Sequence, residues 1–353
     1  MSLLQGGSHS IELRRVGNNL PSRMADNFYW LGRYAARADS TTRLLRSTLL
    51  RFSLENTGST MPLLVPLLLA LEAQGQLSTS VVLSASRPNP EGLEADLLAA
   101  IFDPSRAGSL RDIANSLQRL AMLVRDRTSN DLWRVLSQLH DRLTLPVSRP
   151  VMLAGDAIGI LNHTLLGIAA FHGLARENMT RAQGWRFLDM GLRLEHATNL
   201  CTLLDRALHS PEADNPSMLE AVLEVVDNSL TYRSRYNLLP HIAAVYDLVL
   251  LDDTNPRSLL FQLNQLVKHF ERLPRERESA LPSPGQRILL ECVTRLRLLD
   301  PRPLAACTTN WQRSDAGQVI QFIADALPRL SDAIAVSYFS HSTISLSGAT
   351  TPR

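Results

Sequence analysis

Apolar residues recur along most of the chain at spacings of three and four positions, which is the period of a helix that buries one face. Runs that alternate apolar and polar residues are nearly absent, and only residues 81–84 and 343–346 could form short strands. Prolines gather in clusters and leave long stretches without a helix breaker. The pattern predicts an all-α protein, an elongated bundle of long helices. The expected helices span residues 22–53, 61–75, 90–103, 108–127, 129–144, 150–172, 178–209, 216–231, 239–251, 256–272, 280–299 and 312–338.

Two of these helices, 22–53 and 178–209, carry the same heptad seam of apolar and small residues at an offset of 159 positions. Gly32 matches Gly191 at this offset. Any two leucine-rich amphipathic helices can share a heptad seam, but matched small residues are what a close helix contact requires. We therefore expect an internal repeat, with both helices at the centre of the bundle and related by an approximate two-fold axis.

The polar faces of the same two helices carry arginine, aromatic and acidic side chains. Trp30, Arg33 and Arg37 share one face of the first helix, away from the seam. Two arginines four positions apart repel each other unless an anion joins them, and Trp30 is placed to cover Arg33 by a cation–π contact. On the second helix, Asp189 and Arg193 have the spacing of an ion pair.

Three segments carry further motifs. Residues 20–39 begin Leu-Pro-Ser-Arg-Met-Ala-Asp-Asn-Phe-Tyr-Trp, residues 179–197 contain Gly-Trp-Arg-Phe-Leu-Asp-Met-Gly, and residues 255–259 follow a Tyr-Arg-Ser-Arg-Tyr cluster at 232–236. In this order the segments resemble the signatures of the bacterial alpha-E domain family. The resemblance runs from about residue 20 to about residue 340.

The resemblance implies one helical domain over residues 20–340. Residues 1–19 are expected to be a flexible lead or linker, and residues 341–353 a flexible tail. The lead lacks the basic and apolar regions of a signal peptide.

The family is named for a Glu-Arg motif, and this chain departs from it at both expected positions. The first would fall at Ala36-Arg37, which lacks the glutamate, and the second at Glu195-His196, which lacks the arginine. The residues that remain, Arg37 and Glu195, are the members retained at the two motif positions, one on each helix. We expect them to face each other across the two-fold axis and to form one ion pair.

The resemblance also implies a functional context. Alpha-E domains typically occur beside, or fused behind, circularly permuted ATP-grasp ligase domains, and they also occur with transglutaminase-like proteins. The setting looks like a peptide synthesis or modification system. The implied partners are therefore a ligase domain, fused or separate, a transglutaminase-like protein and a peptide substrate. ATP and Mg²⁺ are expected only on the partner ligase domain, and no cofactor is expected in this chain.

Composition narrows the setting of the chain. Its 353 residues are 45% hydrophobic and 20% charged, with a formal net charge of +2, which argues against nucleic acid as the main partner. The most apolar run, residues 61–73, is too short to span a bilayer. Three cysteines in a chain of this length do not make a disulfide scaffold. We expect a cytoplasmic protein with no membrane segment.

Several catalytic and cofactor motifs are missing from the sequence. Lys268 is the one lysine against 35 arginines, and it does not stand in a phosphate-binding P-loop. The sequence contains no G-x-S-x-G, no H-E-x-x-H and no C-x-x-C motif. No Glu-x-x-His pair of a di-iron bundle is present either. The sequence therefore predicts no metal site.

Three polar clusters are the candidate binding sites, because arginine matches carboxylate and phosphate groups with two parallel hydrogen bonds. The first contains Arg23, Trp30, Arg33, Tyr34 and Arg37; the second contains Arg176, Glu177, Asn178, Thr180, Arg181 and Trp185; the third contains Tyr232, Arg233, Arg235, Tyr236 and Arg257. Arg193 and Glu195 complete the set of candidates. The alternative is that these residues form solvated faces and interhelical salt bridges. Two clusters that converged in one cleft would favour a site.

These observations leave three hypotheses for the function. The first, which we favour, is a non-catalytic helical domain that binds a substrate or partner in an ATP-dependent peptide ligase system. The second is an enzyme that uses Glu195 as its acid or base, with Arg37 and Arg193 holding an anionic group. The third is a structural oligomer built from exposed faces of the bundle.

Overall fold

The computed structural model describes residues 20–55, 62–85, 92–144, 153–208, 210, 212–236, 239–274, 281–305 and 314–339. Every regular element within these ranges is helical, so the predicted all-α class is confirmed. The possible strand at 343–346 and the expected lead and tail lie outside the described residues.

The helices follow one another along the chain with short connections. In order they are α1 (Ser22–Glu55), α2 (Leu64–Ala73), α3 (Thr79–Ala85), α4 (Leu93–Phe102), α5 (Leu110–Leu123), the 3₁₀ turn η1 (Arg125–Arg127), α6 (Asn130–Thr144), α7 (Ala154–Asn178), α8 (Gln183–Leu208), α9 (Pro216–Val225), α10 (Ser229–Tyr236), α11 (Ile242–Tyr246), the π-helical η2 (Asp247–Leu251), α12 (Leu259–Arg272), α13 (Pro284–Arg297), α14 (Pro301–Leu304) and α15 (Ser314–Tyr338).

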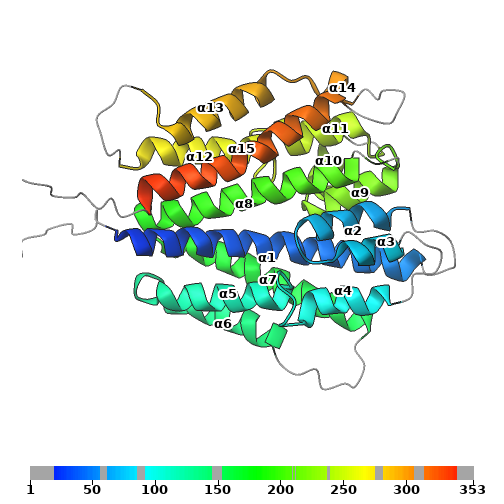
Figure 1. Ribbon diagram of the computed structural model, residues 1–353, viewed down its shortest axis with the longest axis horizontal. Helices are drawn as coiled ribbons and strands as arrows, with labels where there is room; N and C mark the ends of the chain where they lie inside the picture. The colour runs from blue at the N-terminus through cyan, green and yellow to red at the C-terminus, as the bar shows by residue number, and fades with distance from the viewer. Residues whose placement is uncertain are drawn as a thin grey trace, which may run out of the picture.

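Helices α1 and α8 form the central layer of the bundle (Figure 1). On one side, α5 and α7 pack against α1, and α6 packs on both of them. On the other side, α12 and α15 pack against α8, and α13 covers both. The short helices α2 and α9 contact both central helices. Because the two long helices are covered on both sides, each buries residues well beyond its apolar heptad seam.

The contact between α1 and α8 is made by backbone on backbone. A Cβ atom at Gly32 would lie 1.9 Å from the carbonyl oxygen of Leu188, and one at Gly191 would lie 1.9 Å from the carbonyl oxygen of Tyr29. Both positions therefore require glycine. The contact is reciprocal, because Leu188 and Tyr29 are themselves 159 positions apart, like the two glycines. The helices run parallel, since the main-chain N–H of Leu20 also donates to the Gln183 side chain at the start of α8.

The predicted helices agree with the structure at most positions, but α14 was not predicted and α8 begins at Gln183 instead of 178. Residues 81–84 belong to helix α3 and form no strand. The helix expected at 216–231 is two helices, α9 and α10, separated by Asp227, whose φ of 58° is left-handed and cannot continue a helix. Helix α7 continues to Asn178 instead of ending at 172.

The expectation of no membrane segment rested on residues 61–73, and one other helix, α7, bears on it. By length and composition α7 could cross a membrane, with a mean hydropathy of 1.4 over its most apolar window. In the structure 33% of that window is buried, and the helix packs against α1 and α6 as part of the bundle.

The glycine contact gives the first prediction. Replacing Gly32 or Gly191 by alanine should lower the free energy of unfolding by about 2–4 kcal/mol, because the new methyl group meets backbone that cannot rotate away. The two losses should be similar, since the contact is reciprocal. Chemical denaturation measures both.

The matched control is Gly159→Ala in α7, where a Cβ would meet nothing within 4 Å. This change should raise stability by about 0.5–1 kcal/mol, the ordinary gain of alanine over glycine in a helix. Equal effects at Gly32 and Gly159 would contradict the close contact.

Candidate functional site

The Glu195 carboxylate on α8 is held by two arginines of α1. Arg33 Nε lies 2.6 Å from Glu195 Oε2, and Arg37 Nε lies 2.6 Å from Glu195 Oε1. The predicted ion pair between Arg37 and Glu195 is therefore present, and Arg33 is a second partner that the prediction did not include. Glu195 is only 2% exposed, so its charge is balanced almost entirely by these two guanidinium groups.

Aromatic rings of α1 cover both arginines. The guanidinium carbon of Arg33 lies 5.0 Å from the ring centroid of Trp30, as predicted, and that of Arg37 lies 5.0 Å from the centroid of Tyr34. Burial by itself lowers the pKa of Arg33, but the charges and hydrogen bonds of Glu195 and Tyr29 together outweigh burial and raise it. Arg33 therefore stays charged inside the bundle.

The same cluster ties the last helix to the centre. Arg33 Nη1 donates to Ser331 Oγ of α15 at 3.2 Å, and the hydroxyl groups of Tyr29 and Ser331 are 2.9 Å apart. The first predicted cluster thus acts mostly as an interhelical network. Arg23, also assigned to this cluster, lies exposed at the start of α1.

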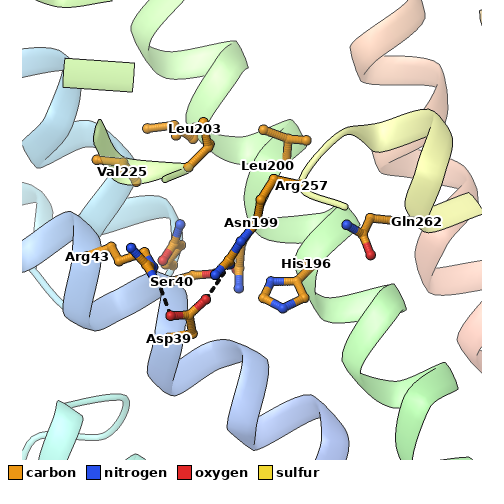
Figure 2. A pocket seen from close by; sticks show the side chains of 12 residues that line it. Asp39, Ser40, Arg43, His196, Asn199, Leu200, Leu203, Val225, Arg257 and Gln262 are labelled. Atoms are coloured by element: carbon orange, nitrogen blue, oxygen red, sulfur yellow. Dashed lines mark hydrogen bonds and ion pairs between the residues drawn. The ribbon is translucent and has the colours of Figure 1, made fainter. Parts of the chain in front are cut away.

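A second buried carboxylate, Asp39, holds the loop before α12 against α1. Asp39 Oδ1 accepts from Arg43 Nε at 2.8 Å, and Asp39 Oδ2 accepts from Arg257 Nη1 at 2.5 Å (Figure 2). Burial alone raises the pKa of Asp39, but the guanidinium groups of Arg257 and Arg43 outweigh burial and hold it well below its usual range. Both arginines also approach Asp227, at 3.8 Å from Arg257 and 3.1 Å from Arg43.

A third carboxylate, Asp189, joins α8 to α12. Its Oδ1 lies 3.0 Å from Arg193 Nη2, which confirms the predicted i, i+4 pair, and its Oδ2 lies 2.6 Å from His269 Nε2. Burial raises the pKa of Asp189, but the hydrogen bond from His269 and the charge of Arg193 together outweigh burial and lower the pKa to about 2. Arg193 also donates to Gln262 Oε1 at 3.2 Å.

A cavity of about 600 Å³ opens between α7, α8 and the segment that leads into α12. Arginines from three parts of the chain line it: Arg176 at the end of α7, Arg181 and Arg193 from the α8 region, and Arg257 before α12. Trp185 lines it as well, with the Arg181 guanidinium 4.3 Å from its ring. Two predicted clusters therefore converge here, through Arg181 and Trp185 of the second and Arg257 of the third.

The other members of the third cluster lie elsewhere. Arg233 lines a separate cavity of about 560 Å³, beside Arg51 and Glu224. Arg235 is ion-paired with Asp252. The two tyrosines have structural hydrogen bonds: the main-chain N–H of His241 donates to Tyr232 Oη at 3.0 Å, and Tyr236 Oη donates to Asp247 Oδ2 at 2.5 Å. Glu195, the candidate acid or base, does not line the arginine-rich cavity.

Two histidines, His172 and His196, line the arginine-rich cavity with their ring centroids 6.4 Å apart. Burial lowers the pKa of His172 to about 4, against the opposing effect of Asp39, and burial also holds the pKa of His196 well below 6.5. Both rings are therefore uncharged at neutral pH. His172 Nε2 is buried and has no hydrogen-bond partner in the part of the chain that the structure describes.

The carboxylates and histidines of the interior do not form a metal site. Among the described residues, no group of three or more His, Cys, Asp or Glu side chains could hold a metal ion. Each of the three buried carboxylates is instead paired with arginine.

Reasoning from the sequence missed Asp39, Gln262 and His269, which position the arginines. The i, i+4 spacing of Asp39 and Arg43 was readable as an ion pair. The contacts from Asp39 to Arg257 and from Asp189 to His269 join residues far apart in the chain, and no local pattern points to them.

The fold and its charged interior define an all-helical domain built on one central helix pair. Residues 20–339 match the Alpha-E family, described as a predicted alpha-helical domain with a conserved ER motif. The chain belongs to this family.

Two relatives, uncharacterized protein Rv2567 of Mycobacterium tuberculosis strain H37Rv and uncharacterized protein Mb2597 of Mycobacterium bovis, are each 30% identical to the chain over 331 residues. The match covers 89% of this chain and 36% of each relative, so the chain spans about a third of the length of the relatives it matches. No solved structure matches the chain significantly.

The pairing of Glu195 gives the second prediction. Glu195→Gln keeps the shape of the side chain but leaves two partly buried guanidinium groups without a counter-charge, so it should lower the free energy of unfolding by about 2–4 kcal/mol. The control is Glu291→Gln in α13, whose half-exposed pair with Arg295 at 3.0 Å should contribute less than about 1 kcal/mol. A Glu195→Gln protein as stable as the control would contradict the structural role.

The third prediction concerns pH. The His172 pKa is about 4 in the folded chain and near 6.5 when exposed, so the unfolded chain takes up the proton first as pH falls. Stability should therefore decrease from pH 6.5 to pH 4, with His172 accounting for about 3 kcal/mol at most. In denaturation curves at several pH values, His172→Gln should flatten this decrease. His163→Gln, at an exposed position of the same helix, should leave it unchanged, and an equal slope in both variants would contradict the assignment.

Proposed function

We propose that the chain is an accessory helical domain that binds a substrate or partner in an ATP-dependent peptide (amide) ligase system, either beside the ligase or as the C-terminal part of a fused ATP-grasp ligase. The observation that carries the proposal is the convergence of four arginines and Trp185 on one cavity, whose lining does not include the candidate acid or base Glu195. Such a cavity suits recognition of an anionic ligand better than chemistry on it.

Membership of the Alpha-E family supports the same role. In the mycobacterial relatives the matching region is 36% of the whole protein, as expected of a domain that works beside others. Under this proposal ATP and Mg²⁺ bind the ligase domain, the chain supplies helical surfaces and the arginine-rich cavity, and a transglutaminase-like protein is a further partner.

The enzyme hypothesis finds less support in the geometry. A carboxylate that is 2% exposed and paired with two arginines is held in its charged form, with little access to a substrate. His172 is a weak base, because burial lowers its pKa. We therefore assign Glu195 a structural role.

We also propose that α1 and α8 are the two copies of an internal repeat. The reciprocal contact of Gly32 and Gly191 supports the two-fold relation. Gly32 meets the main chain of Leu188, Gly191 meets the main chain of Tyr29, and these two residues are themselves equivalent in the repeat. The ion pair between Arg37 and Glu195 also supports the two-fold relation. Arg37 is the residue that the chain keeps of the first Glu-Arg motif, and Glu195 is the residue that it keeps of the second.

The fourth prediction tests the ligase partner. The chain should form a complex with the circularly permuted ATP-grasp ligase encoded beside it, or with that domain expressed separately where the two are fused. The dissociation constant should be about micromolar or tighter, as measured by light scattering after size exclusion and by calorimetry. An ATP-grasp ligase of ordinary strand order is the control and should not bind. Absence of a complex at concentrations of about 50 μM would contradict the proposed partner.

A further inference from the structure

The arginine-rich cavity between α7, α8 and α12 carries an excess of positive charge. Arg176, Arg181, Arg193 and Arg257 line it, and Asp189 is the acidic side chain in its wall. Two of these charges are balanced: Arg193 is paired with Asp189, and Arg257 is paired with Asp39. Neither Arg176 nor Arg181 has an ion pair among the described residues, so within this part of the chain the cavity keeps two uncompensated positive charges.

The two uncompensated arginines stand where an incoming anion would meet them. Both are exposed; Arg176 lies in the last turn of α7, and Arg181 lies in the connection between α7 and α8. Arg181 donates to the carbonyl oxygens of Met179 and Arg176, at 3.3 and 2.5 Å, and its guanidinium lies over Trp185. These contacts fix its position without neutralising its charge. Arg176 makes no ion pair within the described chain, so its donors are available to a ligand.

Apolar side chains form the rest of the cavity. Leu188 and Leu192 of α8 provide aliphatic surface, and Trp185 and Phe261 provide two aromatic rings from different helices. A site with arginine on one part of its wall and aromatic and aliphatic side chains on another matches a ligand with an anionic head and an apolar body. A volume of about 600 Å³ is enough for a body of one or two amino-acid side chains.

One further polar group in the lining of the cavity is the His172 imidazole. His172 Nε2 is buried beside the cavity and lacks a hydrogen-bond partner among the described residues. A buried polar atom without a partner costs free energy, so a ligand or water that bonds to it would stabilise the site. The cavity beside Arg233 differs in its charge, because one of its arginines, Arg51, is paired with Glu224 of the same lining.

We propose that this cavity binds an oxyanion, a carboxylate or a phosphate, carried on an apolar or aromatic body, with Arg176 and Arg181 contacting the anion and Trp185 and Phe261 contacting the body. The inference rests on the proposed binding role of the chain, but not on the ligase as its partner. The C-terminal carboxylate of a peptide with an apolar last residue and an aromatic phosphate both have this chemistry.

The fifth prediction is tested on the full chain alone, by calorimetry and by indole fluorescence. The probes are N-acetyl-phenylalanine, phenyl phosphate, the neutral N-acetyl-phenylalaninamide and inorganic phosphate. The two aromatic anions should bind at least about tenfold more tightly than the neutral amide, because only they pair with arginine. They should also bind more tightly than inorganic phosphate, which has no apolar body. The tighter of the two identifies the anion as carboxylate or phosphate.

Variants then locate the site. Arg176→Gln should weaken binding of the tighter probe about threefold to tenfold. Arg142→Gln, a change at an equally exposed arginine of α6, should leave binding unchanged. Trp185→Phe should reduce the fluorescence response while it retains most of the affinity. Each variant is checked for the wild-type unfolding midpoint.

Three outcomes would overturn the proposal: no binding of either aromatic anion at about 10 mM, equal binding of the neutral amide, or equal weakening by Arg176→Gln and Arg142→Gln. Because no ligase is present, these results are independent of whether a ligase complex forms.

Discussion

The backbones of α1 and α8 touch, and the rest of the structure depends on this contact. Glycine at positions 32 and 191 lets the two helices approach until each meets a carbonyl oxygen of the other. One turn further along, the same approach brings Arg33 and Arg37 within 2.6 Å of Glu195. A bulkier residue at either glycine would separate the helices and leave a buried carboxylate and two partly buried guanidinium groups without partners, which would lower stability.

The charged interior extends from this helix pair toward the surface. Glu195, Asp39 and Asp189 are all buried, and each is held by arginine from α1, from α8 or from the segment before α12. Ion pairs of this kind contribute little net stability, because desolvation offsets most of the attraction, but they fix geometry. Here they orient Arg193 and Arg257 at the wall of the arginine-rich cavity, whereas Arg176 and Arg181 have no ion pair among the described residues.

Some of this arrangement could be read from the sequence. The helical period and the proline clusters predicted the all-α class. Arg37 and Glu195, the members retained at the two motif positions, predicted their ion pair. The break at Asp227 was missed because a left-handed residue other than glycine leaves no clear mark in an apolar pattern. The sequence predicted the residues of the cavity only as separate clusters. Arg257 is held at the cavity by its ion pair with Asp39, which is 218 positions away in the chain. Contacts at such separations depend on how the helices pack and not on local spacing.

Native-state hydrogen exchange tests the central role of the helix pair most directly. If the contact between α1 and α8 is the most stable part of the bundle, main-chain amides near Gly32 and Gly191 should exchange only through global unfolding. They should then be the slowest to exchange in the chain. Amides of the outer helices α4 and α13 should exchange faster, through partial opening that leaves the central pair intact. Exchange at the glycine contact that is as fast as in the outer helices would contradict the account.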